Sequence, residues 1–304
     1  MSLIKQVLSF ENLSSAWEEV ASKKGAPGVD RISIRRWRRH WEEHLYDLSY
    51  EVLTNTYQPS PSKKFYIPKK KGGWRRISIL TVTDRVLQRA VLRVVDDLFD
   101  YGFLDCSFGF RQGRGVRDAV TRIIERRDQG FTWVLDADID DCFNNLDHTL
   151  IWHFFRQTIA DPILNRLVGQ WLRVGASSEK DHRGIEMGGV VSPLFCNLVL
   201  HQVDRILSVS DWKMVRYADD FCVFTMSEEE TYHAYELVHD VLNALHLQYE
   251  PRKTRITNFD HGFDFLGGTF IRDEYHFTSN KKRVVVEGDL DNDLFIDYHP
   301  EGYQ

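Results

Sequence analysis

The sequence predicts an α+β fold whose second half is a split βαβ unit, an antiparallel sheet with helices on one face. Two observations predict this class. The hydrophobic periodicity changes near residue 131, where mainly helical patterns give way to alternating strands and helices. When residues 145–190 are set aside as an insertion, the later elements have the order β-α-β-β-α-β. A chain of 304 residues can hold one large domain or two closely associated subdomains.

The first half is expected to be helical, with one basic hairpin. Apolar residues over 34–48 recur at spacings of three and four, which marks one face of a helix. Seven of the fourteen residues over 63–76 are basic, and two short apolar strands flank a Gly-Gly turn there. Asp84 is expected to cap a buried helix. A stretch with six arginines over 111–127 is expected to run from a loop into another helix.

The second half opens with a buried strand over residues 131–139 that ends in acids. The later elements are expected to be helices near 149–159 and 163–173, a helix from Ser192-Pro193, strands over 213–217 and 221–225, a helix near 228–246 and a strand near 254–259. Ser192 would cap its helix and Pro193 would occupy the first turn, where no backbone N–H is needed.

The net charge of −6 conceals a gradient along the chain. Residues 1–130 hold 24 Lys and Arg against 16 Asp and Glu, a net of +8, and residues 131–304 hold 15 against 29, a net of −14. This asymmetry predicts a basic half that holds phosphates and an acidic half with another task. No apolar run approaches the roughly 18 residues of a membrane span, and the four cysteines are far apart. A cytoplasmic protein with no membrane segment and no structural zinc site is expected.

Three carboxylates are expected to meet at one edge of the predicted sheet. Asp138 ends the first strand, and Asp219 and Asp220 lie in the turn between the next two strands. Because the first and third strands can be central neighbours in a split βαβ sheet, residues about 80 positions apart would come together. Converging carboxylates repel one another unless a divalent cation neutralises them, and such oxygen ligands suit Mg²⁺. The alternative is ordinary turn chemistry, with most of these acids solvated.

A series of short motifs lies in order between residues 25 and 270. They are Gly25-Ala26-Pro27-Gly28-Val29-Asp30, Ile67-Pro68-Lys69 with Gly73-Trp74-Arg75-Arg76, Ser107-Phe108-Gly109-Phe110-Arg111, Asp138-Ile139 through Phe143 with Asp147-His148, Gly188-Gly189-Val190-Val191-Ser192-Pro193-Leu194 with Asn197, Tyr217-Ala218-Asp219-Asp220, Lys253-Thr254 and Phe265-Leu266-Gly267-Gly268. In this order the set resembles the reverse transcriptase family, in particular the bacterial group II intron-type enzymes. Each motif is weak alone, but the ordered set is specific.

The resemblance implies a fold of fingers and palm and a role for each matching residue. The metal ligands that it implies, for two Mg²⁺ ions that Mn²⁺ is expected to replace, are Asp138, Asp219, Asp220 and the Ile139 carbonyl. The nucleotide-binding residues that it implies are Lys69, Arg75, Arg111, Phe143, Gly188 and Gly189. Its contacts to primer or template are Tyr217, Ala218, Ser192 and Pro193. Lys253 joins the three aspartates as a catalytic residue, a proton donor to the leaving pyrophosphate, and Phe143 would reject a 2′-hydroxyl.

Fingers are expected over 1–130 and a palm over 131–270, with the helical insertion 145–190 packing toward the fingers. Residues 271–304 read as a short acidic extension, with no full thumb. One departure stands out, because Glu186-Met187 replaces the Pro-Gln that usually precedes the glycines of this motif. The sequence therefore leaves open how well the chain handles nucleotide, and whether a partner supplies a thumb.

The leading hypothesis is an RNA-directed DNA polymerase that extends a primer 3′-OH with dNTPs by two-metal phosphoryl transfer. Its expected partners are an RNA template, a DNA or RNA primer and, for a free-standing enzyme of a defence or host pathway, a CRISPR integrase or another subunit. Two alternatives stay open. One is a nucleic-acid-binding scaffold with weak or vestigial activity, and the other is a template-independent nucleotidyltransferase.

Overall fold

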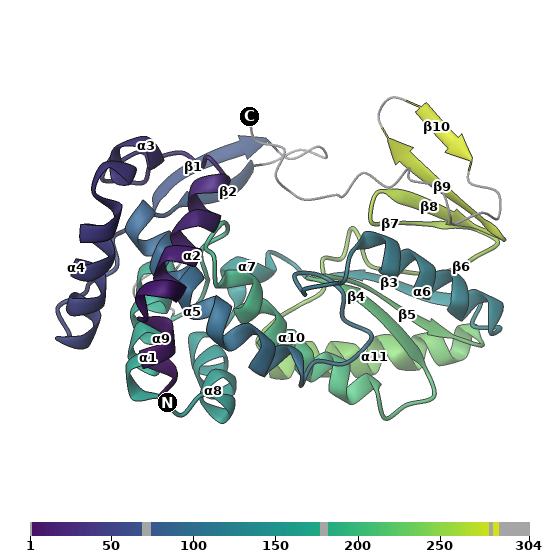
Figure 1. Cartoon of the computed structure of the whole chain (residues 1–304). Coiled ribbons are helices and arrows are strands. Elements are labelled where there is room, and N and C mark those ends of the chain that lie inside the picture. Colours follow the sequence, from purple (N-terminus) through teal and green to yellow (C-terminus); the bar gives the residue numbers. More distant parts are fainter. Residues whose placement is uncertain (1, 69–73, 177–181, 280–281, 286–304) are drawn as a thin grey trace. The chain divides into compact units, whose positions relative to one another are not determined.

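The structure is a computed structural model that describes residues 2–68, 74–176, 182–279 and 282–285 (Figure 1). The chain forms two compact units. The first unit contains residues 1–102 and 142–199, and the second contains residues 103–141 and 200–304. Among the described residues, no helix combines the length and the hydropathy needed to span a membrane.

The first unit is mainly helical. Its helices are α1 (Leu3–Val7), α2 (Phe10–Ser22), α3 (Ile34–Trp37), the 3₁₀ helix η1 (Arg38–His40), α4 (Trp41–Leu53), α5 (Val82–Asp100), α7 (Cys142–Asn145), α8 (His148–Thr158), α9 (Pro162–Gly175) and the first part of α10 (Ser192–Leu207). The helix that was expected to be continuous over 34–48 is broken, because His40 leaves the helical region with φ −132° and ψ 35°. Trp37 anchors the break, since its indole N–H donates to Thr83 at 3.1 Å.

A buried network fixes the start of α5. Thr81, and not Asp84 as expected, is the residue that caps this helix, because the Thr81 hydroxyl accepts from the Asp84 backbone N at 3.1 Å. The Asp84 carboxylate accepts hydrogen bonds from the Thr81 and Tyr57 hydroxyls at 2.6 and 2.7 Å. Asp84 therefore stabilises the first turn from inside the helix.

The predicted basic hairpin is confirmed. Strands β1 (Lys63–Pro68) and β2 (Trp74–Ile79) pair antiparallel, with Lys63 opposite Ile79 and Pro68 opposite Trp74. Lys69 and the glycines of the expected turn lie outside the described residues. The backbone N of Ser78 donates to the Met187 carbonyl at 2.8 Å, which links β2 to the segment before α10.

The second unit contains the predicted split βαβ sheet. Strands β3 (Trp133–Asp138), β4 (Lys213–Tyr217), β5 (Asp220–Thr225) and β6 (Arg255–Asn258) are antiparallel and have the spatial order β4-β5-β3-β6. Helix α11 (Glu228–Ala244) packs on β3 and β5, and α10 reaches the same face, where Asp204 binds Arg216 of β4. The fold class expected from the sequence is thereby confirmed.

The opposite face of this sheet is covered by helix α6 (Val116–Asp128) and by an aromatic cluster that the sequence did not predict. Strands β7 (Phe263–Phe265), β8 (Gly268–Ile271), β9 (Glu274–Ser279) and β10 (Lys282–Val285) form an antiparallel sheet of their own. The first strands contribute Phe263, Phe265 and Phe270 to the core of the unit. Part of the segment read as an acidic extension is therefore sheet.

The two units divide the chain differently from the boundaries drawn on the sequence. Residues 103–130 pack in the second unit, whereas the insertion 145–190 lies in the first unit. The Arg166 guanidinium donates to the Val52 carbonyl at 2.7 Å, and the Gln170 amide donates to the Tyr57 carbonyl at 3.1 Å. The division into fingers and palm at residue 130 stays a prediction.

Candidate active site

The register of strands β3 and β5 brings Asp138 and Asp220 together. In the antiparallel pair of β3 and β5, Asp138 lies directly opposite Asp220, and Tyr217 on β4 is opposite Asp220 on the other side. Residues that face each other across antiparallel strands have Cβ atoms about 4.5–5.5 Å apart. The structure therefore brings these two carboxylates together at the same end of two central strands, and the sequence predicted this meeting.

Asp219 lies in the tight turn between β4 and β5. Ala218 has a φ of 60°, in the left-handed region that a residue with a Cβ uncommonly adopts. Ala218 is also 6% exposed, so this strained residue is packed and not free at a loop tip. A non-glycine residue held in this conformation needs support from its surroundings.

The electrostatics of this edge are dominated by like charges. Burial is the largest cause that raises the pKa of Asp220 well above its ordinary value, and the charges of Asp138 and Asp136 raise it further. Burial also raises the pKa of Asp136 to about 6, against the opposing effect of Arg255, whose Nε donates to it at 3.0 Å. Concentrated negative charge of this kind favours a cation in the site.

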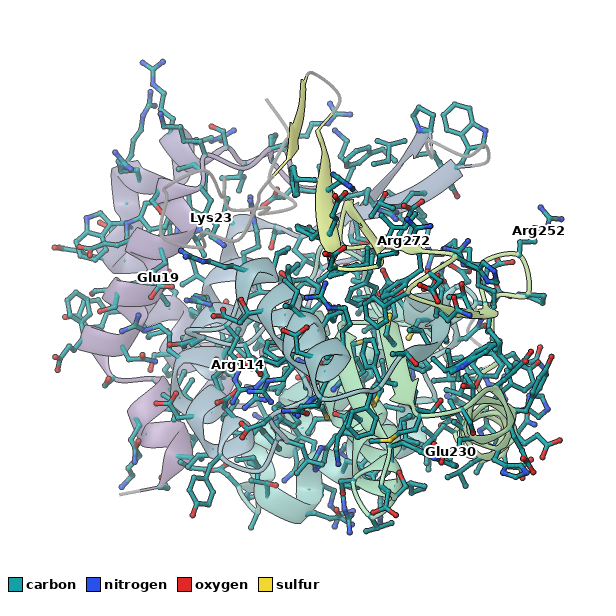
Figure 2. The ribbon with its side chains drawn as sticks, turned by 90° about the vertical axis from the view of Figure 1, so that its right-hand side faces the viewer. Glu19, Lys23, Arg114, Glu230, Arg252 and Arg272 are labelled. Atoms are coloured by element: carbon teal, nitrogen blue, oxygen red, sulfur yellow. The ribbon has the colours of Figure 1, made fainter. Side chains whose placement is uncertain are left out.

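One cation of the chain already occupies part of the site. The Lys253 ammonium donates to Asp138 Oδ2 at 2.7 Å. Partial burial is the largest single cause and lowers the pKa of Lys253, but the hydrogen bond and the charge of Asp138, together with the charges of Asp220 and Asp219, raise the net pKa. The neighbouring Arg252 extends away from the protein, so Lys253 is the side chain of this pair that turns onto the site (Figure 2).

The acidic edge fits a divalent cation in donor chemistry, because carboxylate oxygens are the ligands that Mg²⁺ prefers. In the described part of the chain, no group of three Asp, Glu, His or Cys side chains is arranged as a ready-made metal site. The Lys253 ammonium occupies one Asp138 oxygen. An ion that used Asp138 fully would have to displace Lys253. The Ile139 carbonyl stays a predicted ligand, and the Ile139 side chain is 1% exposed.

A buried ion pair behind the turn was missed by the sequence reasoning. Arg216 Nε donates to Asp204 Oδ1 at 2.7 Å, and its Nη2 donates to Oδ2 at 2.6 Å. The third donor, Nη1, reaches the Ala218 carbonyl at 3.0 Å. The available signal was Arg216 itself, a charged residue between the apolar pair Met214-Val215 and the motif that begins at Tyr217.

The segment around Arg111 also braces the turn. The backbone N of Phe108 donates to the Arg216 carbonyl at 2.8 Å, and the backbone N of Arg216 donates to the Cys106 carbonyl at 2.7 Å. Arg111 is 7% exposed, and its guanidinium donates to the Leu104 and Ser107 carbonyls at 2.7 and 3.0 Å. These hydrogen bonds stabilise the loop before Arg111. The contact of Arg111 with nucleotide stays a prediction.

The predicted nucleotide residues Gly188 and Gly189 lie in the first unit, in the segment that leads into α10. Gly188 has a φ of +105°, and a Cβ on it would lie 2.6 Å from the Ser78 carbonyl oxygen. A Cβ on Gly189 would lie 2.6 Å from the Ser192 hydroxyl. Gly188 therefore requires glycine for its backbone conformation, whereas at Gly189 the crowding comes mainly from the Ser192 side chain. Ser192 and Pro193 begin α10 as predicted, and Ser192 is 3% exposed.

The other nucleotide-binding residues that were predicted in the first unit differ in exposure. Phe143 is half-buried in α7, and its carbonyl accepts from the Ile185 backbone N at 2.8 Å. Arg75 is exposed on β2, opposite Ile67. Lys69 lies outside the described residues. The roles of Phe143, Arg75 and Lys69 stay predictions.

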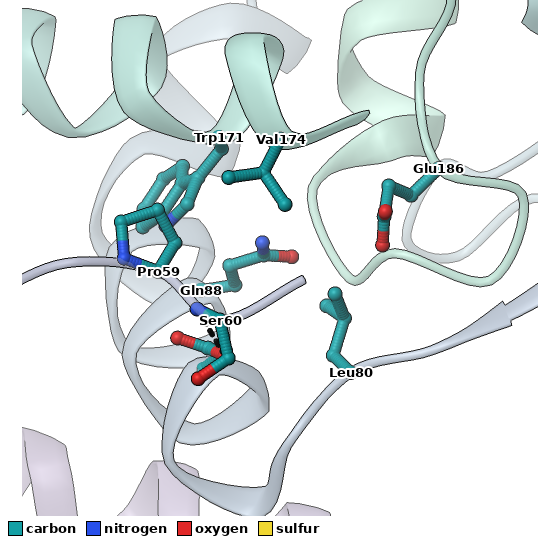
Figure 3. A pocket seen from close by; sticks show the side chains of 8 residues that line it. Pro59, Ser60, Leu80, Gln88, Trp171, Val174 and Glu186 are labelled. Atoms are coloured by element: carbon teal, nitrogen blue, oxygen red, sulfur yellow. Dashed lines mark hydrogen bonds between the residues drawn. The ribbon is translucent and has the colours of Figure 1, made fainter. Parts of the chain in front are cut away.

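Glu186 points into a small cavity of the first unit, not out of it (Figure 3). The cavity has a volume of about 10 Å³, which is room for one water molecule. Its lining consists of Pro59, Ser60, Leu80, Asp84, Gln88, Trp171, Val174 and Glu186. Glu186 is 8% exposed, and neither carboxylate oxygen has a hydrogen-bond partner among the described residues. Burial is the largest cause that raises the pKa of Glu186.

Comparisons with known proteins give the class of this molecule. Residues 67–270 match the reverse transcriptase (RNA-dependent DNA polymerase) family. Protein YkfC of Escherichia coli is 30% identical over 93% of this chain and 86% of its own length. The group II intron-encoded protein LtrA of Lactococcus lactis is 31% identical over 55% of this chain and 28% of its own length. Apo telomerase from Candida tropicalis shares the fold, with a TM-score of 0.56 at 12% identity over 75% of this chain and 51% of its own.

The chain belongs to the reverse transcriptase family of RNA-directed DNA polymerases, and its relatives are of the group II intron-like kind. The resemblance in the sequence motifs is thereby confirmed. The chain spans only about a quarter of the intron-encoded protein LtrA.

Proposed function

We propose that this chain extends a primer 3′-hydroxyl with deoxynucleotides on an RNA template, using a site built on Asp138, Asp219 and Asp220. The observation that carries the proposal is the register of β3 and β5, which sets Asp138 opposite Asp220 next to the Asp219 turn. Carboxylates that converge at the ends of neighbouring strands are costly without a cation. Membership of a polymerase family supports assigning that cation to phosphoryl transfer.

The three aspartates would hold two divalent cations, with the Ile139 carbonyl as an additional ligand. When bound, Mg²⁺ or Mn²⁺ would lower the pKa of the primer hydroxyl and neutralise charge on the triphosphate. Lys253 would leave Asp138 when the ions bind, which frees its ammonium to donate a proton to the pyrophosphate. The exposed position of Lys253, whose side chain is 50% accessible, supports such a movement.

The remaining predicted residues would position the substrates. Arg75 and Lys69 would hold the triphosphate, because arginine binds phosphate oxygens in pairs and lysine acts as a point charge. Gly188 and Gly189 would line the nucleotide pocket. Phe143 would select deoxynucleotides, which a comparison of dNTP and rNTP use by a Phe143→Ala variant would test. An unchanged preference in that variant would remove this role.

Primer extension on an RNA template, with Mg²⁺ or Mn²⁺, tests the proposal. The wild type should incorporate dNTPs, and a variant with Asp219→Asn and Asp220→Asn should lose incorporation by roughly a thousandfold or more while remaining folded, since the metal supplies several kcal/mol of charge stabilisation. The matched control is Asp240→Asn, an exposed aspartate on α11. No incorporation by the wild type with either ion would contradict the proposal.

The second candidate is a nucleic-acid-binding scaffold with weak or vestigial catalysis. The Lys253 ammonium, which already neutralises part of Asp138, favours it. Binding of an RNA–DNA hybrid that survives Asp138→Asn with Asp219→Asn, together with an inactive wild type, would support this candidate. Spacer acquisition beside a CRISPR integrase, or another defence or host pathway, rests on the group II-like motifs alone. The genes beside this one would decide it.

A further inference from the structure

The turn that carries Asp219 has a strained backbone and a specific support. Ala218 holds the left-handed conformation with φ 60°, and its carbonyl accepts a hydrogen bond from Arg216 Nη1 at 3.0 Å. The peptide between Ala218 and Asp219 contains this carbonyl. Because a peptide unit is planar, fixing the carbonyl also fixes the direction in which the Asp219 backbone leaves the turn.

We propose that Arg216 is a positioning residue: clamped by Asp204, it holds the Ala218 carbonyl and thereby sets the orientation of the Asp219 carboxylate. The inference rests on the proposed function, because it takes Asp219 as a ligand of the divalent cation. Arg216 and Asp204, which are not among the predicted ligands of the ion, would act on Asp219 through the backbone of the turn.

Burial and geometry support a positioning task. The side chains of Arg216 and Asp204 are 1% and 0% exposed, and the two hydrogen bonds between them lie within the second unit. A buried ion pair is a poor source of stability, because its desolvation cost offsets most of its attraction and apolar residues can often replace it. A planar guanidinium binds a carboxylate with two parallel donors and offers another to a carbonyl, a geometry that a lysine ammonium does not reproduce.

The backbone of Arg216 is fixed as firmly as its side chain. Its N–H donates to the Cys106 carbonyl and its carbonyl accepts from Phe108, at 2.7 and 2.8 Å. Gly109 follows directly, and a Cβ there would overlap the Ala218 backbone N and lie 2.9 Å from the Tyr217 carbonyl carbon. The turn is thus held by Arg216 from within β4 and by the 106–109 segment from beside it.

A double variant separates positioning from stability. Arg216→Met with Asp204→Leu replaces the ion pair by apolar side chains and leaves no buried charge, so the fold should remain stable. Mn²⁺ binding without nucleotide, measured by electron paramagnetic resonance, should nevertheless weaken roughly tenfold, because the hydrogen bond to Ala218 is lost. In primer extension kcat should fall while KM for the primer–template is unchanged. The control is Arg122→Met, which removes an arginine of α6 paired with Glu125.

Each outcome decides the inference. Wild-type Mn²⁺ affinity in a folded double variant would overturn it and leave the proposed function standing. No Mn²⁺ binding by the wild type would overturn both. If the double variant unfolds, Arg216→Lys decides the question, since lysine keeps the charge but not the fork. A folded lysine variant with weakened Mn²⁺ binding would support the inference, and one with unchanged binding would overturn it.

Discussion

Two carboxylates of the second unit, buried Asp204 on α10 and half-buried Asp220 on β5, have opposite electrostatic surroundings. Asp204 is enclosed with Arg216, which binds both of its oxygens. Burial is the largest cause and raises the pKa of Asp204, but the charge and hydrogen bonds of Arg216, together with His201, outweigh it and the net pKa is lowered. Asp220 is surrounded by other acids, so burial and like charge both raise its pKa.

The difference shows how to distinguish a structural carboxylate from a functional one. Both groups are costly to bury, since an ionised carboxyl loses its hydration. The fold compensates Asp204 completely within the chain. Among the described residues, the cation that lowers the pKa of Asp220 is Lys253, which is bound to Asp138 and half-exposed. An acid whose charge is only partly compensated at the end of a strand is a feature that stability alone does not explain, and it indicates a ligand of positive charge.

The largest effect on stability is expected from removing Arg216, the partner of Asp204. Arg216→Met alone should lower the free energy of unfolding by about 3–5 kcal/mol, because it leaves the Asp204 charge buried without a partner. Urea unfolding of the variant and the wild type measures this. A loss below about 1 kcal/mol, the level of an exposed pair, would mean that Asp204 is not held as a buried charge.

A smaller effect is expected from crowding the turn. Gly109→Ala should cost about 1–3 kcal/mol of stability, because the new Cβ overlaps the backbone of Ala218. Primer extension should fall with it, since the Asp219 turn would shift. The control is Gly115→Ala, directly before α6. The nearest atom to a new Cβ there is Asp118 Oδ2 at 3.8 Å. Equal effects of the two alanines would contradict the close packing of the turn.

Neutralising Asp220 should raise the stability of the fold instead of lowering it. The pKa of Asp220 is raised in the folded protein, so the stability linked to its protonated form is present at low pH and is lost as pH rises through the folded pKa. Asp220→Asn removes this loss. Without divalent cations, the melting temperature of the variant should therefore exceed that of the wild type at pH 8 and approach it near pH 4. A lower melting temperature at pH 8 would contradict the like-charge account.

The smallest effect concerns Glu186 in the first unit. Burial raises its pKa, so its stabilising contribution is complete below the ordinary value near 4.5 and is lost as pH rises through the folded pKa. Glu186→Gln keeps the shape and removes the charge. The difference in unfolding free energy between variant and wild type should be near zero at pH 4 and favour the variant at pH 8. A difference that does not change with pH would contradict this.

The sequence predicted the sheet and the meeting of the acids because both follow from local patterns. Asp138 and Asp220 end and begin strands of alternating or apolar character, and the split βαβ order makes those strands neighbours. The Arg216–Asp204 pair could not be predicted, since it joins a strand to a helix through side chains that no periodicity links. The second sheet, with four strands of three to six residues over 263–285, was not predicted from the sequence.

Thermal unfolding with increasing Mg²⁺ at pH 8 tests the central claim, that Asp138, Asp219 and Asp220 form a site for divalent cations. An ion that binds only the folded chain stabilises it by roughly 2.7 kcal/mol at one hundred times its Kd. The melting temperature of the wild type should therefore rise with Mg²⁺, and that of a variant with Asp138→Asn and Asp219→Asn should stay constant. The same rise in both proteins, or none in the wild type, would contradict the claim.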